Sequence, residues 1–318
     1  MKLRRLQRHE IGEVRREAVD GETLARAGEI VEEVRSSRER ALRRHAVHFG
    51  DLETDQPFTV DPTDLKDALA GLPGDQRAAL ERMADRIEAF ARAQRGSFHD
   101  VAVPVQGGMA GHTIAAVDRA GCYAPGGRYP LPSSVLMTAV TARAAGVAEV
   151  WVASPRPPQI TLAAAAIAGV DGFLAVGGAQ AIAALAYGVG GPPPSDVVVG
   201  PGNRWVTAAK KVVSGHVGID MLAGPSELVV LADDSAEPGT IAADLIAQAE
   251  HDPDALPVLV TTDASLVDAV DAELDLQLAD LPTRGNARAA MDNGFAVITH
   301  TLEEAIETCD RLAPEHLQ

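Results

Sequence analysis

The chain changes character at about residue 113, and this change constrains its fold more than any other feature. From there on, short runs of β-branched or apolar residues alternate with alanine-rich runs, and glycine or proline stands at the corners. Strands that alternate with helices in this way form βαβ units, whose strands pair in parallel because each helix crosses back over the sheet. We therefore predict an α/β protein built on doubly wound parallel sheets.

The predicted elements fall into two series. In the first series we expect strands at 149–153, 173–176 and 196–199, and helices at 135–145, 159–168 and 179–187. In the second we expect strands at 228–232, 257–261 and 296–299, with helices at 239–250 and from 265 onward. Two tandem Rossmann-like units follow, with a boundary between Met221 and Glu227.

The residues before this region read as helices. Leu80, Met83, Ile87 and Phe90 recur at three- and four-residue spacing, which predicts a helix with one buried face. An arginine-rich run at 32–44 is typical of a solvated helix face. Because 46% of the residues are hydrophobic and only 3% are aromatic, the core must be aliphatic.

Charge and cysteine content narrow the class of partner. A net charge of −17 repels nucleic acid and anionic membranes, so a small-molecule ligand is favoured. The two cysteines have no CxxC spacing, and the N-terminus has no apolar stretch, which favours a reducing, cytoplasmic location. The longest apolar run, at 160–170, is too short to span a bilayer.

Three glycine-rich corners are candidates for a ligand site. The corner at 176–180 would present backbone amides and the Gln180 side chain to a phosphate or ribose. The corner at 200–203 places Asn203 at a helix N-cap, and a third turn at 121–127 carries Tyr123, which could stack on a flat ring. None of the three corners has the GxGxxG spacing, and each by itself is also explained as a plain tight turn. Three such corners along one sheet favour a ligand site.

The second series carries polar candidates for metal binding and catalysis. Gln248 and His251 stand three apart on a predicted helix and would project from one face, as zinc ligands could. The Ser226 hydroxyl enters a strand from a polar turn. Glu315 and His316 could do general acid/base work, or form an exposed ion pair; spacing alone does not choose.

Six segments in a fixed order resemble one family. The stretches GCYAPGG, VGGAQAIAALAYG, VGPGNRWVTAAKK, IDMLAGPSE, AQAEHDPDA and LAPEHL are similar to histidinol dehydrogenase. The resemblance covers the chain from about residue 101 to its end. It implies a zinc-containing enzyme that oxidises L-histidinol through the aldehyde to L-histidine while two NAD⁺ are reduced in turn. It also implies a homodimer.

The resemblance assigns roles to residues by motif. It implies NAD contacts at Tyr123, Gln180 and Asn203 and zinc ligands at Gln248 and His251. Substrate contacts would be Ser226, Gln248, His251 and His316, and Glu315 with His316 would be the catalytic pair. It further implies three parts: a helical segment at 1–123 packed with the last unit, an inserted NAD-binding unit at 124–225, and a substrate and zinc unit at 226–318.

The resemblance also predicts a shortened member of the family. Relatives continue through a segment that carries an Asp and a His as further zinc ligands, and no segment of this sequence matches it. Two alternatives stay open. One is an NAD-binding pseudoenzyme or interaction module, and the other is a dehydrogenase of another alcohol, such as a sulfonated diol.

Overall fold

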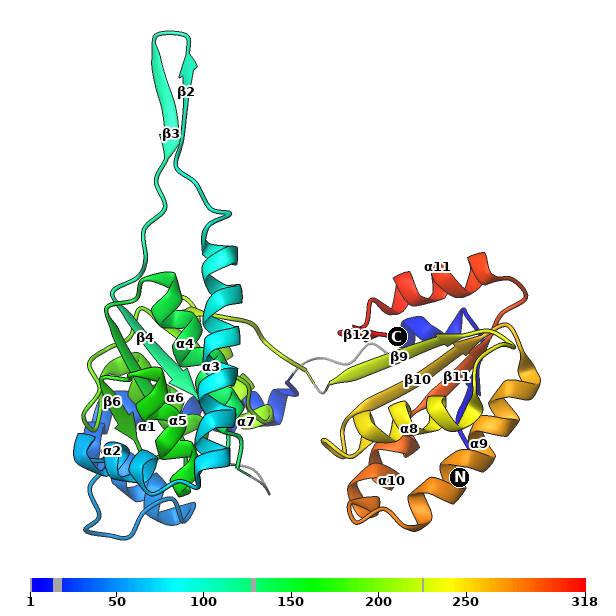
Figure 1. Ribbon diagram of the computed structural model, residues 1–318, viewed down its shortest axis with the longest axis horizontal. Coiled ribbons are helices and arrows are strands. Elements are labelled where there is room, and N and C mark those ends of the chain that lie inside the picture. The colour runs from blue at the N-terminus through cyan, green and yellow to red at the C-terminus, as the bar shows by residue number, and fades with distance from the viewer. Residues whose placement is uncertain (1, 14–18, 127–129, 225) are drawn as a thin grey trace. The chain divides into compact units, whose positions relative to one another are not determined.

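The computed structural model describes residues 2–13, 19–126, 130–224 and 226–318 (Figure 1). They form two compact units. The central unit is Val19–Leu222, and the terminal unit combines Met1–Ala18 with Ala223–Gln318. Each contains a five-stranded sheet whose strands all pair in parallel, so the predicted α/β class with two Rossmann-like sheets is confirmed.

The sheet of the central unit has the order β6-β5-β4-β7-β8. Its strands are β4 (Arg119–Tyr123), β5 (Glu149–Ala153), β6 (Gly172–Leu174), β7 (Val197–Val199) and β8 (Gly218–Ile219). The chain first adds strands on one side of β4 and then returns to its other side. This reversal between β4 and β7 is a topological switch point, where parallel sheets bind ligands.

Helices cover both faces of this sheet (Figure 1). One layer contains α4 (Pro132–Ala145) and α5 (Gln159–Ala168), against which α3 (Gly74–Arg95) and α2 (Pro62–Ala70) pack. The other contains α6 (Gly178–Tyr187) and α7 (Arg204–Val213), against which α1 (Gly21–His48) packs. The alanine-rich α6 is buried almost throughout, because its small side chains let neighbours approach on every side.

The predicted stripe on α3 is right in part. Leu80 is buried and Ile87 packs against the core beside the sheet, but Met83 is 37% exposed and Phe90 68% exposed. The buried face includes alanines that the pattern of large residues does not reveal, such as Ala84 and Ala91. The helix therefore exists as predicted, with its buried face rotated relative to the expected one.

A hairpin that the sequence analysis did not anticipate extends from the central unit (Figure 1). Its strands β2 (Val101–Val105) and β3 (Gly108–His112) pair in antiparallel register, and every residue in both is exposed. The strands carry few large residues apart from Val101, Val103, Val105 and Met109.

The sheet of the terminal unit has the order β1-β11-β10-β9-β12. Its strands are β1 (Arg4–Leu6), β9 (Glu227–Ala232), β10 (Leu256–Thr261), β11 (Phe295–Ile298) and β12 (His316–Leu317). The helices are η1 (Glu10–Glu13), α8 (Pro238–Ala249), α9 (Ala264–Ala279), α10 (Arg284–Asn293) and α11 (Leu302–Leu312). The aliphatic core packs Leu245, Leu259 and Leu274 together, as the low aromatic content predicts.

The division between the units differs from the expected one. We expected residues 1–123 to pack with the last unit, but residues 19–123 belong to the same compact unit as 124–222, and only residues 1–18 join 223–318. The reason is helix packing: α1 lies on α6 and α7, and α3 lies on α4. The expected boundary residue Pro225, like Gly127 of the third glycine corner, lies outside the described residues.

Two other expectations concern membranes and cysteines. Within the described residues, no helix combines the length and hydropathy needed to cross a bilayer. Cys122 and Cys309 are both free and buried.

Candidate functional site

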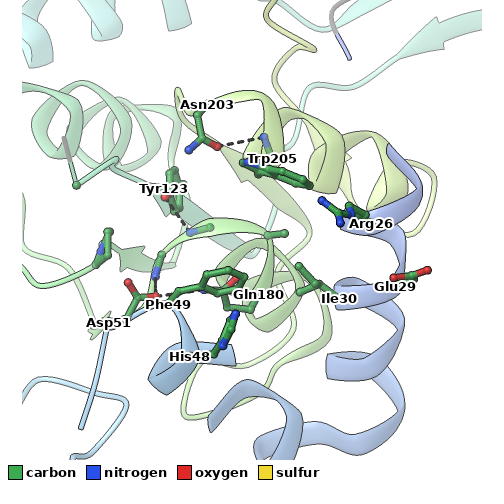
Figure 2. Close-up of a pocket in the computed structure, with 15 residues that line it drawn as sticks. Arg26, Glu29, Ile30, His48, Phe49, Asp51, Tyr123, Gln180, Asn203 and Trp205 are labelled. Carbon is green, nitrogen blue, oxygen red and sulfur yellow. Dashed lines mark hydrogen bonds between the residues drawn. The ribbon is translucent and has the colours of Figure 1, made fainter. Parts of the chain in front are cut away.

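The central unit holds a pocket of about 600 Å³ at the carboxyl ends of its strands (Figure 2). Its lining includes Tyr123, the last residue of β4, together with residues that follow β5, β6 and β7. Tyr123, Gln180 and Asn203, which the sequence analysis drew from three separate corners, all line it. The pocket therefore lies at the switch point of a parallel sheet, the usual place for a nucleotide.

We expected Tyr123 in a turn, but it is the last residue of the central strand β4. It is only 4% exposed, so its ring is not free to stack on a flat ligand; Phe49, 50% exposed, is the more open ring in the lining. The Tyr123 hydroxyl accepts a hydrogen bond from the Gly178 amide at 3.0 Å. Burial raises the pKa of Tyr123 to about 12, so the hydroxyl keeps its proton and can still donate it.

Gln180 is held by a residue that the sequence analysis missed. The Asp51 carboxylate accepts hydrogen bonds from the Gly177 amide at 3.0 Å and from Gln180 Nε2 at 3.2 Å. Asp51 is 8% exposed and Gln180 2% exposed. Burial raises the pKa of the Asp51 carboxyl, although both hydrogen bonds oppose the shift. At the start of α6, the Gly177 and Gly178 amides are thus paired within the chain, contrary to our expectation that they stay open for a phosphate.

Asn203 caps α7, as predicted. Its Oδ1 accepts from the amides of Trp205 at 3.1 Å and Val206 at 3.3 Å, which leaves the side-chain NH₂ to a ligand (Figure 2). The corner before it is held by the buried Lys210, which donates to the Gly200 carbonyl at 3.0 Å and forms an ion pair with Asp220. Asp220 also accepts from the Gly200 amide at 2.8 Å.

The terminal unit has a shallower pocket of about 390 Å³. Gln248, His251 and His316 line it, together with Asp244 one helical turn before Gln248. We expected His251 on the helix, but α8 ends at Ala249 and His251 lies just after it. This pocket lies at the amino ends of the strands, since His316 pairs with Leu228 near the start of β9.

Gln248 carries an unusual polar atom. Its Nε2 is buried and has no hydrogen-bond partner among the described residues. Buried amide groups are almost always paired, so a missing partner is indicated here. The two ends of an amide are nearly indistinguishable in structures, and the turned-over amide would present Oε1, a zinc donor, at the same place. Gln248 and His251 thus fit two positions of a zinc shell, although no cluster of three His, Cys, Asp or Glu in the described residues is arranged to hold a metal.

The predicted catalytic pair lies beside this pocket. His316 Nε2 is 3.8 Å from Glu315 Oε1, and the two side chains are 56% and 45% exposed. Of the pair, only His316 is among the residues that line the pocket. Ser226 does not line it; its carbonyl accepts from the Leu256 amide at 3.1 Å just before β9.

Asp51 and Asp244 were missed for different reasons. Asp51 follows a long helix and meets its partners more than 120 residues away, so nothing local marks it. Asp244 did leave a signal, because it stands four residues before Gln248 on the same predicted helix and therefore shares its face.

Comparison with known proteins identifies the family of the chain. The family model for histidinol dehydrogenase matches residues 14–318. Histidinol dehydrogenase of Thermus thermophilus is 48% identical over 292 residues, which are 91% of this chain and 69% of that protein. The enzyme of Aromatoleum aromaticum is 42% identical over 306 residues, 94% of this chain and 70% of that one.

A solved structure gives the same result. The crystal structure of histidinol dehydrogenase from Elizabethkingia anophelis superposes with a TM-score of 0.88 at 29% identity, over 99% of this chain and 75% of that one. The family match covers nearly the whole sequence, and the fold is shared as well. The chain therefore belongs to the histidinol dehydrogenase family.

Proposed function

We propose that the protein is an NAD-dependent dehydrogenase that oxidises L-histidinol to L-histidinaldehyde and then to L-histidine, in histidine biosynthesis in the cytoplasm. The observation that carries the proposal is the meeting of Tyr123, Gln180 and Asn203 in one pocket at a switch point. NAD⁺, when bound there, accepts one hydride in each of the two oxidations. Gln180 and Asn203 contribute amide groups, and Tyr123 a protonated hydroxyl, to hold it.

The substrate would bind in the pocket of the terminal unit. Gln248, His251 and His316 would contact L-histidinol, and Ser226 would join them through its hydroxyl. Gln248 and His251 would hold zinc, which would supply a Lewis acid that orients the amino alcohol and its imidazole ring. The buried, unpaired amide nitrogen of Gln248 supports this assignment.

Glu315 and His316 supply the proton chemistry. His316 takes the hydroxyl proton as hydride leaves the carbinol carbon, which forms the aldehyde. Glu315 takes a proton from the water that adds to the aldehyde, which forms the hydrate that is the substrate of the second oxidation. The 3.8 Å separation of the two side chains supports a shared site of action.

The test is NADH formation from L-histidinol with Zn²⁺ added. It is run on the chain alone and with a C-terminal segment supplied from the Thermus thermophilus relative. Turnover in either sample supports the proposal. Turnover of a sulfonated diol but not of histidinol would identify a dehydrogenase of another alcohol, and NADH binding with no turnover in any sample would identify a binding module.

We further propose that the protein forms a homodimer, as the family resemblance implies. The exposed β2–β3 hairpin supports a protein partner, because Val101, Val103 and Val105 share one face of a strand and lie in solvent. Light scattering should give the mass of a dimer. Val103→Asp should shift it toward the monomer, and an unchanged mass would exclude this hairpin from the interface.

A further inference from the structure

The contacts of Asp51 determine how the side-chain amide of Gln180 is oriented. A carboxylate can only accept hydrogen bonds, so the Gln180 amide must turn Nε2 toward Asp51 at 3.2 Å. The opposite end, Oε1, is then directed to the other side. It stands beside Gly178, where a Cβ would come within 3.0 Å of it. No described residue donates a hydrogen bond to this oxygen.

The same carboxylate also holds the backbone of the corner. It accepts at 3.0 Å from the amide of Gly177, the N-cap of α6, and this glycine has no side chain with which to cap the helix. A negative charge is favourable at the start of a helix. Asp51 itself is anchored by its amide, which donates to the Ala46 carbonyl at 2.8 Å at the end of α1. Through its backbone amide and its side chain, one buried residue thus joins α1, the Gly177 corner and Gln180.

We propose that Asp51 is a positioning residue that fixes the Gln180 amide with its carbonyl oxygen toward the cofactor pocket. There the oxygen accepts a hydrogen bond from a donor of the nucleotide, either a ribose hydroxyl or the carboxamide NH₂. The inference rests on the proposed NAD site, and goes beyond it by assigning the polarity of the contact and the residue that sets it.

Both hydrogen bonds are accepted by one oxygen of the carboxylate, Oδ2, so Asp51→Asn can keep both of them through its carbonyl oxygen. The substitution Asp51→Ala removes that acceptor, and the Gln180 amide can then turn its NH₂ toward the pocket. Gln180 would then present a donor to a ligand that also donates. We expect NADH to bind about tenfold more weakly, the effect of losing one hydrogen bond.

A second change should restore the acceptor. In the double variant D51A/Q180E, the carboxylate introduced at position 180 presents an oxygen to the pocket whichever way it turns. We expect NADH affinity to return to within about threefold of the wild type, so the two changes should be strongly non-additive. Asp67→Ala, the same change at an exposed position on α2, should leave affinity unaltered.

The measurements are NADH binding by fluorescence titration and the NMR signal of the Gln180 side-chain NH₂, assigned by its loss in Q180E. In the wild type, this signal should shift as Asp51 is protonated, which needs no variant at Asp51. Equal affinity of wild type and D51A, or a double variant as weak as the product of its single changes, would overturn the inference. So would a Gln180 signal that does not respond to Asp51.

The NMR readout separates this inference from the proposed function. If the wild type binds no NADH, the proposed function fails. The Gln180 signal then still reports whether Asp51 orients the amide: a signal that responds to acid and changes in D51A supports the orientation, and an unresponsive one refutes it.

Discussion

The two pockets differ in where they lie on their sheets and in how their polar groups are paired. The pocket of the central unit is at the carboxyl ends of its strands, where Tyr123 bonds to the Gly178 amide and Asp51 to Gln180. The pocket of the terminal unit is at the amino ends, where His316 is exposed and Gln248 has a buried nitrogen with no partner among the described residues. The first pocket is preorganised by its own chain, whereas the second contains a buried amide nitrogen that no described residue pairs.

The substitution with the largest expected effect tests whether the two pockets have different functions. His316→Ala should lower kcat for histidinol oxidation about 100-fold or more, because a general base is lost. NADH affinity should stay within about twofold, since His316 belongs to the terminal unit. His300→Ala, an exposed histidine of the same unit, serves as the control. Equal losses from both variants would remove His316 from the proposed role.

A steric test addresses the rigidity of the central pocket. A Cβ at Gly200 would stand 2.1 Å from the Tyr123 carbonyl oxygen, and Gly200 has φ +123°. Gly200→Ala should destabilise folding by about 3 kcal/mol and weaken NADH binding. Gly215→Ala shares the positive φ, +95°, but meets nothing within 4 Å, so it should lose only about 1 kcal/mol. Chemical denaturation gives both values, and equal losses would show that the close approach to Tyr123 is unimportant.

A pair of helix caps separates stability from binding. Asn203→Ala in the central unit and Thr301→Ala in the terminal unit each remove a side chain that caps a helix. Both should cost about 1 kcal/mol of stability. Only Asn203→Ala should also weaken NADH binding, which titration measures. A binding loss in the Thr301 variant, or none in the Asn203 variant, would contradict the division between the pockets.

The smallest expected effect is on the pH dependence of folding stability, whose sign should differ between Asp51 and Asp263. Burial raises the pKa of the Asp51 carboxyl, so the folded protein binds this proton more tightly than the unfolded chain. Stability from this group is therefore present at low pH and is lost as pH rises from the ordinary aspartate pKa to the raised one. Asp263, which caps α9, has the opposite sign: hydrogen bonds from Ser265 lower its pKa, so its contribution is lost as pH falls.

Melting curves of D51N and D263N across the acidic range check these signs. Relative to D51N, the wild type should become less stable as pH rises through that range. Relative to D263N, the wild type should become more stable as pH rises toward the ordinary aspartate pKa from below. Curves of the same sign for both variants would contradict the assigned causes.

Much of the fold could be predicted because its signals are local. The helix at 159–168 and the strand at 149–153 have the predicted bounds, since periodicity and corner residues mark them. Strand β4 could not be predicted from Gly121–Tyr123, whose glycine indicated a turn. Gly121 is instead needed for close packing, because a Cβ there would stand 2.8 Å from Ser195 Oγ and 3.0 Å from Leu185 Cβ.

The candidate site, like the fold, could be predicted only where its signals are local. By itself the sequence determined the alternation of strands and helices, the cap at Asn203 and the order of motifs that identifies the family. Only the tertiary structure decided that residues 19–123 join the central unit, that the second pocket lies at the amino ends, and that Asp51 meets Gln180 from 129 positions away. Caps and periodicity act between residues a few positions apart, whereas these contacts depend on how distant elements pack.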